Sequence, residues 1–556
     1  MRFRVGPLAQ CQRFGIGVAR STPVNSLRHH ENIVLTLELN SLGPIPDWAA
    51  YPNGPRILGT ENVEMSRTTP YQLVLPPRTS SVPSSHWLRE ALRSGILSGM
   101  LRPGQRMPAT RELARHYGLS RGTVLAAIDD LKAEGYVRGA PGSGTFVCDL
   151  LPEELMRSRA PSAPRKKAPA GEFPRLSDYA MRVKPVPYFA NPASLAFRTN
   201  LPALDLFPTT LWAQVASRRL RRVSTSDLLG CSTSGYWPLR QVLAEYLRAE
   251  RGVRCETEQI VIVSGIQEAF DLVARLLLNP GDRVLLEDPG FQGAYAAFEA
   301  AGASLVSIPI DAEGAAPGRH DFRNARLMYV TPGHQFPTGI TMAHRRRVEI
   351  LRHARESGTM ILEDDYDSEY RYSGHPIPAM QGIDRDNLVI FTGGFNKVLF
   401  PSLRMAYIVL PPALLENFVM IKALLSRHHS VFDQTVVCDF IEQGHFGRHL
   451  RRMRKIYAER LQALSHHASR HLSGVLRLSD IEAGLQTIGW LKTGILAEDA
   501  AFAAAKRKID VVPLSRYCHA SRLEEGIQIG FAAVDEASIA KGILGLAEAV
   551  HSVDRA

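Results

Sequence analysis

Apolar positions in the last two-thirds of the chain follow two alternating patterns. Short runs of consecutive apolar residues are followed by longer stretches in which apolar residues recur every three or four positions. The first pattern is typical of a buried strand and the second of an amphipathic helix. Their alternation predicts an α/β domain with a mainly parallel sheet that helices cover on both faces. The predicted strands are residues 259–263, 283–287, 304–310, 326–330, 359–364, 388–392 and 405–410.

A different pattern occupies residues 84–147. Thr110 is placed to cap a short amphipathic helix, and Gly118 permits a turn after it. Ser120 is placed to cap a second helix, and two short strands joined by a glycine-rich turn follow. A helix, a turn, a helix and a β wing form the pattern of a DNA-binding domain, although the helices alone would also suit an ordinary helical hairpin.

The charge and the cysteine spacing indicate which partners and which kinds of site this protein is expected to have. The 556 residues include 66 Lys and Arg against 55 Asp and Glu, a formal net charge of +11, which favours a polyanionic partner only weakly. No apolar run approaches the roughly 20 residues of a membrane span. The six cysteines are scattered without a CxxC pair, so we expect neither a metal site nor a disulfide framework. These features predict a cytoplasmic multidomain protein.

Composition suggests the domain boundaries. Residues 1–64 show no sustained periodicity, and we interpret them as an unassigned extension or, preferably, as an upstream stretch included by a wrong start, with Met65 as the true start. Residues 65–148 form the expected DNA-binding domain. Residues 149–193 are rich in Pro, Ala and basic residues and are expected to be a linker. Residues 194–556 form the large α/β domain.

Several motifs of the smaller domain occur in a characteristic order. They are Leu101-Arg-Pro-Gly-Gln-Arg-Met-Pro108, Arg111-Glu-Leu-Ala, Leu119-Ser-Arg-Gly-Thr-Val124, Glu134-Gly-Tyr136 and Gly142-Ser-Gly-Thr-Phe146. In this order the segment resembles the winged helix-turn-helix domain of GntR-type regulators. The resemblance implies that DNA is contacted by Arg111, Ser120, Arg121, Thr123 and Gly142.

The large domain carries three local features with related chemistry. Residues 261–270 run from a strand through a tight turn into a helix, so the N–H groups of Gly265, Ile266 and Gln267 can face a phosphate. Carboxylates follow the strand 359–364, where ligands of open α/β sheets bind. Lys397 lies in a glycine-rich turn and can form a Schiff base with an aldehyde.

Together with other motifs, these features resemble fold type I aminotransferases and, over the range from Met65 onward, the MocR subfamily of GntR regulators. The further marks are Gly235-Tyr-Trp-Pro-Leu-Arg240, Glu287-Asp-Pro-Gly-Phe291, Thr331-Pro-Gly-His-Gln-Phe-Pro-Thr-Gly339 and Arg448-His-Leu-Arg-Arg-Met-Arg454. The resemblance implies pyridoxal phosphate as the cofactor, with Lys397 as its Schiff-base lysine.

The same resemblance assigns further roles at the cofactor site. Asp364 faces the pyridine nitrogen, Tyr366 lies near the ring hydroxyl, Phe291 stacks on the ring, and Arg404 binds the phosphate. His334 and Gln335 lie in the loop that supplies a partner for the ring hydroxyl, and either side chain could serve.

Departures from the family pattern bear on activity. Gly394 and Asn396 stand where Ser or Thr is usual, and Gly230-Cys-Ser-Thr233 replaces a stretch whose tyrosine reaches the phosphate from the partner subunit. Gln528 stands where aminotransferases have the arginine that binds a substrate carboxylate, and its loss removes a charge-assisted hydrogen bond. We therefore expect a cofactor-binding domain with a weakened phosphate site and doubtful catalysis.

Three functions are consistent with this sequence. The first is a transcriptional regulator that binds an operator with two half-sites as a head-to-tail homodimer and senses pyridoxal phosphate or an amino-compound effector. The second is an active aminotransferase with an accessory DNA-binding domain, which Lys397 and Asp364 permit and Gln528 disfavours. The third is a DNA-binding scaffold without cofactor, which Gly394 and Gly230 permit. The retained lysine and aspartate favour the first.

Overall fold

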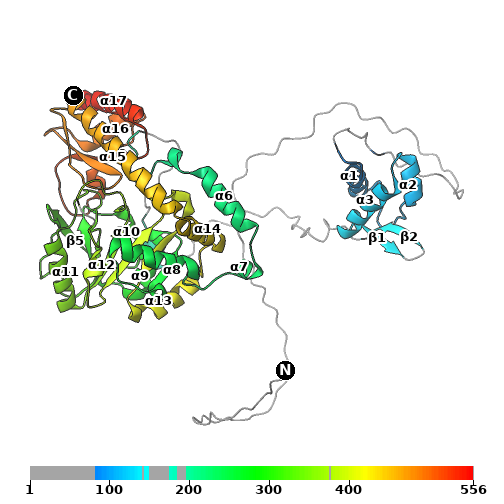
Figure 1. Ribbon diagram of the computed structural model, residues 1–556, viewed down its shortest axis with the longest axis horizontal. Coiled ribbons are helices and arrows are strands. Elements are labelled where there is room, and N and C mark those ends of the chain that lie inside the picture. The colour runs from blue at the N-terminus through cyan, green and yellow to red at the C-terminus, as the bar shows by residue number, and fades with distance from the viewer. Residues whose placement is uncertain are drawn as a thin grey trace, which may run out of the picture. The chain divides into compact units, whose positions relative to one another are not determined.

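The computed structural model describes Leu75 and residues 82–140, 143–149, 175–184, 196–374 and 377–554. The chain divides into two compact units, residues 1–168 and 169–556. Figure 1 draws the helices of the first unit in blue, and those of the second in colours from green to red. The segments expected to be an extension (1–64) and a linker (149–193) lie largely outside the described residues.

The first unit is a winged helix-turn-helix. Helices α1 (Ser84–Leu97), α2 (Thr110–His116) and α3 (Arg121–Ala133) precede an antiparallel pair of strands, β1 (Val137–Ala140) and β2 (Gly144–Val147). One apolar cluster joins them and includes the fully buried Leu92, Val124 and Leu131. The order of elements predicted from the sequence is therefore confirmed.

The capping of the two central helices differs in part from expectation. Ser120 caps α3 as predicted, because its hydroxyl accepts the N–H of Thr123 at 3.1 Å. Thr110, in contrast, is the first residue of α2 and not its cap. The N-cap is Ala109, whose N–H donates to the side chain of Glu112 at 3.1 Å, so a carboxylate in the first turn replaces the expected hydroxyl.

The second unit is built on a large mixed sheet. Its strand order is β3-β10-β9-β8-β7-β4-β5-β6, and the pairs β5–β4, β4–β7, β7–β8 and β8–β9 are parallel, whereas β10 and β6 run antiparallel to their neighbours. The strands are β3 (Ile260–Val263), β4 (Arg283–Asp288), β5 (Ser304–Asp311), β6 (Gly314–Ala315), β7 (Ala325–Val330), β8 (Met360–Asp365), β9 (Val389–Gly394) and β10 (Ala406–Val409).

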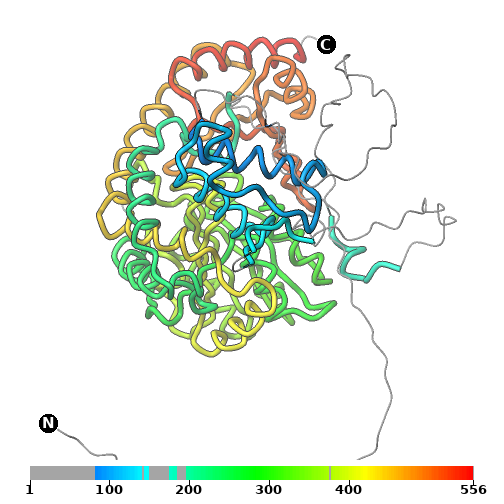
Figure 2. Tube along the Cα trace, turned by 90° about the vertical axis from the view of Figure 1, so that its right-hand side faces the viewer, coloured from blue at the N-terminus to red at the C-terminus, as the bar shows by residue number. Residues whose placement is uncertain are grey.

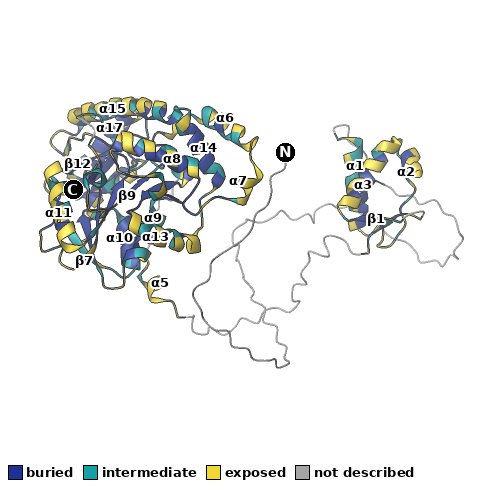
Figure 3. Cartoon of the chain, turned by 60° about the horizontal axis from the view of Figure 1, so that its bottom comes forward, coloured by how far each residue is buried: buried dark blue, intermediate teal, exposed yellow. Residues whose placement is uncertain are grey.

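Helices cover both faces of this sheet. One face packs against α9 (Ile266–Leu277), α10 (Gln292–Ala300) and α13 (Pro412–Leu425). The other packs against α8 (Trp237–Tyr246), α11 (His344–Ser357), α12 (Met380–Ile383) and α14 (Val431–Glu442). The strands are consequently buried between two helical layers, as the dark-blue core of Figure 3 shows.

A second, smaller sheet follows along the chain. Its antiparallel order is β11-β12-β14-β13, with β11 (Leu476–Leu478), β12 (Gln486–Leu491), β13 (Val512–Pro513) and β14 (Gly526–Gly530). The long helix α15 (His445–His471) lies beside α17 (Glu536–Asp554), and α16 (Ala497–Ala505) packs near them (Figure 2).

The remaining elements of this unit are short or peripheral. They are α5 (Asp178–Arg182), α6 (Thr209–Leu220), α7 (Thr225–Leu229), a π-helical turn η2 (Leu247–Arg251) and the 3-10 turns η1 (Leu204–Leu206), η3 (Thr257–Gln259), η4 (Pro401–Leu403) and η5 (Leu514–Tyr517). Among the described residues, no helix combines the length and apolar character that crossing a bilayer requires.

All the predicted strands lie in the large sheet, within one or two residues of their predicted bounds. The prediction missed β6 and the whole smaller sheet. Strands β6, β11 and β13 have only two or three residues, so local periodicity gives them little signal. Strands β12 and β14 contain Gly and Gln among their apolar residues and so lack a continuous apolar run.

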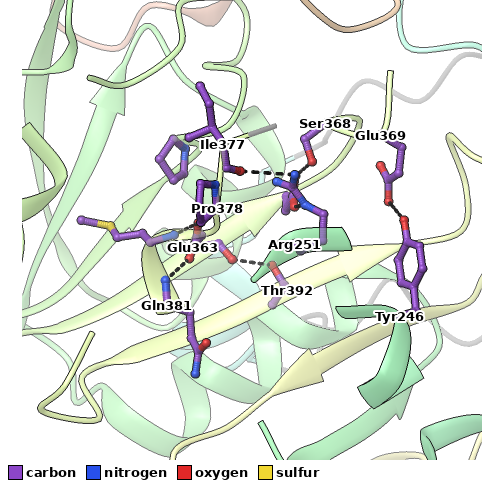
Figure 4. Close-up of polar contacts among 12 residues, drawn as sticks. Tyr246, Arg251, Glu363, Ser368, Glu369, Ile377, Pro378, Gln381 and Thr392 are labelled. Atoms are coloured by element: carbon purple, nitrogen blue, oxygen red, sulfur yellow. Dashed lines mark hydrogen bonds and ion pairs between the residues drawn. The ribbon is translucent and has the colours of Figure 1, made fainter. Parts of the chain in front are cut away.

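A buried polar network fixes the end of β8, the strand that carries Asp364 (Figure 4). Arg251 Nε lies 2.7 Å from Asp365 Oδ2, and both side chains are less than a tenth exposed. The neighbouring Glu363 accepts the backbone N–H groups of Met380 and Gln381 at 2.7 and 2.8 Å. Each buried carboxylate therefore has a partner, as burial of charge requires.

We predict that Arg251→Met destabilises the protein by about 3–5 kcal/mol, because it leaves the Asp365 carboxylate buried without its counter-charge. Urea unfolding monitored by circular dichroism measures the loss. The matched control is Arg319→Met, which removes an exposed ion pair with Glu356 and should cost less than about 1 kcal/mol. Equal losses in the two variants would contradict the role assigned to the buried pair.

Candidate functional site

The proposed DNA-contacting residues lie at the start of two helices in the first unit. Arg111 on α2 and Arg121 on α3 are exposed. Ser120 and Thr123 bind each other through their side chains at 2.8 Å, so they define where α3 begins. Gly142 lies outside the described residues. An exposed arginine at the first position of the second helix is placed as recognition-helix residues are.

In the second unit, the sequence-predicted residues gather at one edge of the large sheet. Strands β4, β7, β8 and β9 are parallel, so their carboxyl ends meet at the same edge. Asp364 lies at the end of β8, and Lys397 follows β9. Gly265 lies two residues after β3, and Arg404 lies two residues before β10, which begins at this edge. The edge is the usual ligand position in open α/β sheets.

The turn between β3 and α9 is shaped for an anion. Gly265 is the N-cap of α9 with φ of 106°, a conformation that side-chain-bearing residues rarely adopt. The first N–H groups of a helix, here those of Ile266 and Gln267, have no partner within the helix. A Cβ added at Gly265 would lie 3.7 Å from the Arg404 guanidinium. The turn therefore brings helix N–H groups and a cation together.

Asp364 is buried and hydrogen-bonded. Its carboxylate accepts the Tyr329 hydroxyl at 2.9 Å and the Thr392 hydroxyl at 3.2 Å. Burial raises the pKa of Asp364 to about 7, against the lowering effect of these two hydrogen bonds. A carboxylate in this state gains most from a cationic partner, such as a protonated ring nitrogen. Tyr329 and Thr392 were not predicted, because they reach Asp364 from adjacent strands.

Lys397 has a depressed affinity for protons. Burial lowers the pKa of its amine to about 8, although the Asp367 and Asp364 carboxylates oppose the shift. Its Nζ donates to the carbonyl oxygen of Asn200 at 2.6 Å. A lysine that is partly neutral near physiological pH is suited to nucleophilic attack on an aldehyde.

The residues expected around the cofactor ring differ in what they contact. Tyr366 Oη lies 3.0 Å from His334 Nδ1, and the same nitrogen lies 2.9 Å from Asp367 Oδ1. Gln335, in contrast, donates its amide to the carbonyl of Pro289 at 2.9 Å. Of the two loop residues between which the sequence left the choice open, His334 is therefore the one in contact with Tyr366.

Phe291 lies beside this group. Its ring meets Phe336 edge-to-face with centroids 5.5 Å apart, and Phe336 in turn contacts Tyr366. Phe291 is the N-cap of α10, so its position is set where β4 ends and the helix begins. Asp367 and Phe336 join the site without having been singled out; Phe336 lies inside the quoted motif Thr331–Gly339, and Asp367 directly follows Tyr366.

Gln528, the residue that departs from the aminotransferase pattern, is fully buried on β14 of the smaller sheet. Its Oε1 accepts the Tyr517 hydroxyl at 2.8 Å. Gly394 and Asn396 flank the turn that holds Lys397, and Asn396 Oδ1 is buried without a hydrogen-bond partner among the described residues.

Comparison with known proteins supports the division into two parts. Residues 86–147 match the family "Bacterial regulatory proteins, gntR family", and residues 200–538 match "Aminotransferase class I and II". The chain is 38% identical to the probable rhizopine catabolism regulatory protein MocR of Rhizobium meliloti, over 86% of this chain and 96% of that protein. It is 27% identical to the pyridoxine biosynthesis transcriptional regulator PdxR of Corynebacterium glutamicum, over 85% and 97%.

Solved structures match the second unit. The α-aminoadipate aminotransferase LysN of Thermus thermophilus, solved with N-(5'-phosphopyridoxyl)-L-leucine, aligns with a TM-score of 0.62 and 29% identity over 68% of this chain and 98% of that one. The regulators, unlike this enzyme, match along both units. The chain therefore belongs to the MocR subfamily of GntR-type transcriptional regulators, in which a winged helix-turn-helix is joined to a fold type I aminotransferase-like domain.

Proposed function

We propose that this regulator binds pyridoxal phosphate at the sheet edge and binds operator DNA through α3 as a homodimer, and that the ligand state of the large domain controls operator binding. The observation that carries the proposal is the convergence of Lys397, Asp364 and the Gly265 turn with Arg404 at one edge of the sheet. We propose that it acts in the cytoplasm, because a transcriptional regulator must reach chromosomal DNA.

The residues present fit this cofactor. The turn at Gly265 and the Arg404 guanidinium suit its phosphate, and the buried Asp364 suits its ring nitrogen. Tyr366, held by His334, suits the ring hydroxyl, and Lys397 suits its aldehyde. When bound, the cofactor would supply an aldehyde that can hold an amine as a Schiff base, and a ring that withdraws electrons from it. The chain's own residues orient it and keep Lys397 partly neutral.

An exposed apolar surface supports a homodimer. Leu228 and Leu229 at the end of α7 are 77% and 85% exposed, and Leu424 at the end of α13 is 90% exposed. The two ends are adjacent, because a Cβ at Gly230, just after α7, would lie 2.6 Å from the side chain of His428, just after α13. Exposed leucines grouped in this way mark an interaction surface. A dimer, which we propose to be head-to-tail, would present two DNA readers to two half-sites.

Control by a ligand follows from linkage. A ligand that binds one arrangement of the domains more tightly raises the population of that arrangement. If that arrangement binds the operator, the affinity for DNA rises, and if it does not, the operator is released. We propose that the cofactor itself, or an amino compound that reacts with it, is this ligand. An aminotransferase activity is the second candidate, which Lys397 and Asp364 favour, whereas the uncharged Gln528 at the far side of the site disfavours it.

We predict that Lys397→Ala abolishes the visible absorbance band of bound cofactor and the borohydride-fixed adduct seen by mass spectrometry. The reason is that Lys397 is the amine at the carboxyl edge of the sheet, beside Asp364. Lys455→Ala is the control, because this exposed lysine on α15 lies outside the site. An adduct that persists in Lys397→Ala would assign the covalent link to another lysine.

The pH dependence of cofactor capture should reflect the lowered pKa of Lys397. Only the neutral amine attacks an aldehyde, so the capture rate of cofactor-free protein should rise with pH through about 8 and then level off. Stopped-flow absorbance between about pH 6 and about pH 10 follows the rate. A rate that keeps rising towards the ordinary lysine pKa would contradict the depressed value.

We predict that Arg121→Ala weakens operator binding without destabilising the protein, because the side chain is exposed at the start of α3. A base contact would cost about 1–3 kcal/mol of discrimination, whereas a phosphate contact would weaken all sequences alike and flatten the salt dependence. Fluorescence anisotropy with operator and random duplexes separates the two. Lys132→Ala, which removes an equal charge at the other end of α3, should have a smaller effect. Unchanged binding by Arg121→Ala would exclude it from the interface.

A further inference from the structure

One face of the smaller sheet carries two buried amide side chains, one of which is connected to the Lys397 turn. Gln486 on β12 lies opposite Gly530 on β14, and Gln528 lies opposite Ile488. Residues opposite one another, and residues two apart along a strand, share a face of the sheet. Gln486 and Gln528 therefore project from the same face, and their exposed fractions are 2% and 0%.

The chain segment 197–200 packs on this face beside Gly530 and Gln486. The Gly530 N–H donates to the Phe197 carbonyl at 2.9 Å, and a Cβ at Gly530 would lie 2.0 Å from the Arg198 carbonyl oxygen. The next residues connect the face to the lysine. Asn200 donates its N–H to Gln486 Oε1 at 2.9 Å and accepts the Lys397 amine at its carbonyl oxygen. A single residue thus links Gln486 to Lys397.

Hydrogen bonds fix the direction of both amides. The Asn200 N–H occupies Gln486 Oε1, and the Tyr517 hydroxyl donates to Gln528 Oε1 at 2.8 Å. Both Nε2 atoms are buried and have no hydrogen-bond partner within the described ranges. Folded proteins rarely leave buried amide donors unsatisfied, so these two atoms point to a bound ligand or solvent.

Thr199 adds a hydroxyl to the same place. It is 1% exposed and its Oγ1 makes no hydrogen bond within the described ranges, and its closeness to the Tyr517 hydroxyl opposes the rise in the pKa of Tyr517 that burial causes. Thr199 lies between Arg198, whose carbonyl packs against Gly530, and Asn200, which binds Gln486. It therefore lies next to the face that carries the two amides. Thr199 Oγ1 and the two Nε2 atoms therefore lie at one face of the smaller sheet, which Asn200 connects to Lys397.

The charges nearby disfavour an anionic ligand. The guanidinium closest in sequence, that of Arg198, is buried and lies 3.6 Å from the Asp510 carboxylate. A ligand carboxylate at Gln486 and Gln528 would lose its water without gaining a free counter-charge, which is costly. A ligand hydroxyl could instead accept an amide N–H and donate to Thr199 Oγ1 without burying a charge.

From this arrangement we infer that the effector of this regulator is a hydroxyl-bearing amine without a carboxylate. Its amine faces Lys397 and the cofactor, and its hydroxyl groups bind Gln486, Gln528 and Thr199. The inference rests on the proposed function, because it requires the cofactor at Lys397, and it adds the chemical class of the ligand.

The test compares two probes with one carbon skeleton. The cofactor-loaded full chain is titrated calorimetrically with 2-amino-1,3-propanediol and with serine, which has a carboxylate where the diol has a hydroxymethyl group. We expect the Kd of the diol to be at least about tenfold lower than that of serine. Serine binding as tightly as the diol, or absence of diol binding, would overturn the inference.

Gln528→Arg provides the reciprocal test. A guanidinium on β14 should raise the affinity for serine and lower that for the diol, each by about tenfold. Gln241→Arg, on the exposed side of α8, adds the same charge elsewhere and should leave the wild-type preference unchanged. If the buried arginine prevents folding, the wild-type comparison alone decides.

The outcome also separates this inference from the proposed function. Absence of the cofactor absorbance band in the wild-type protein would refute the proposed cofactor site itself. A protein that carries the cofactor but prefers serine would refute only the ligand class.

Discussion

Everything at the sheet edge depends on burying carboxylates where parallel strands end. Glu287, Glu363 and Asp364 lie at the ends of β4 and β8, and burial raises the pKa of each to about 7. Such groups are tolerated only when hydrogen bonds or cations meet them. Thr331 meets Glu287, the start of α12 meets Glu363, and Tyr329 and Thr392 meet Asp364.

Within the described residues, the arrangement gives Asp364 no cationic partner. Asp365 has Arg251, and Glu363 has two backbone N–H groups. Asp364 has only neutral hydroxyls, and the nearby Lys397 is itself driven towards its neutral form by burial. The site therefore combines an acid that favours a cationic ring with an amine that favours an aldehyde. A single cofactor with a pyridine ring and an aldehyde would satisfy both groups.

We attribute the ligand specificity of the inferred effector site to the smaller sheet. The large sheet and its helices hold the groups that suit the cofactor, whereas β12 and β14 contribute uncharged amides through Gln486 and Gln528. Segment 197–200 joins the two, because Asn200 binds both Gln486 and Lys397. A ligand that bridges them would change how firmly the two sheets are held together. Such differential binding is what coupling to a DNA-binding domain requires.

The sequence by itself determined the winged helix, the strands of the large sheet other than β6, and the order of the cofactor motifs. These features are local: a cap such as Ser120, an apolar run such as residues 260–263, or a lysine in a glycine-rich turn is visible within a few residues. The sequence did not show which side chains contact one another across the fold. Only the tertiary structure brought Tyr329 and Thr392 to Asp364, chose His334 over Gln335 as the contact of Tyr366, and set Gln486 beside Asn200. These contacts join residues 28 to 286 positions apart, and strand pairing, not local spacing, decides which of them meet.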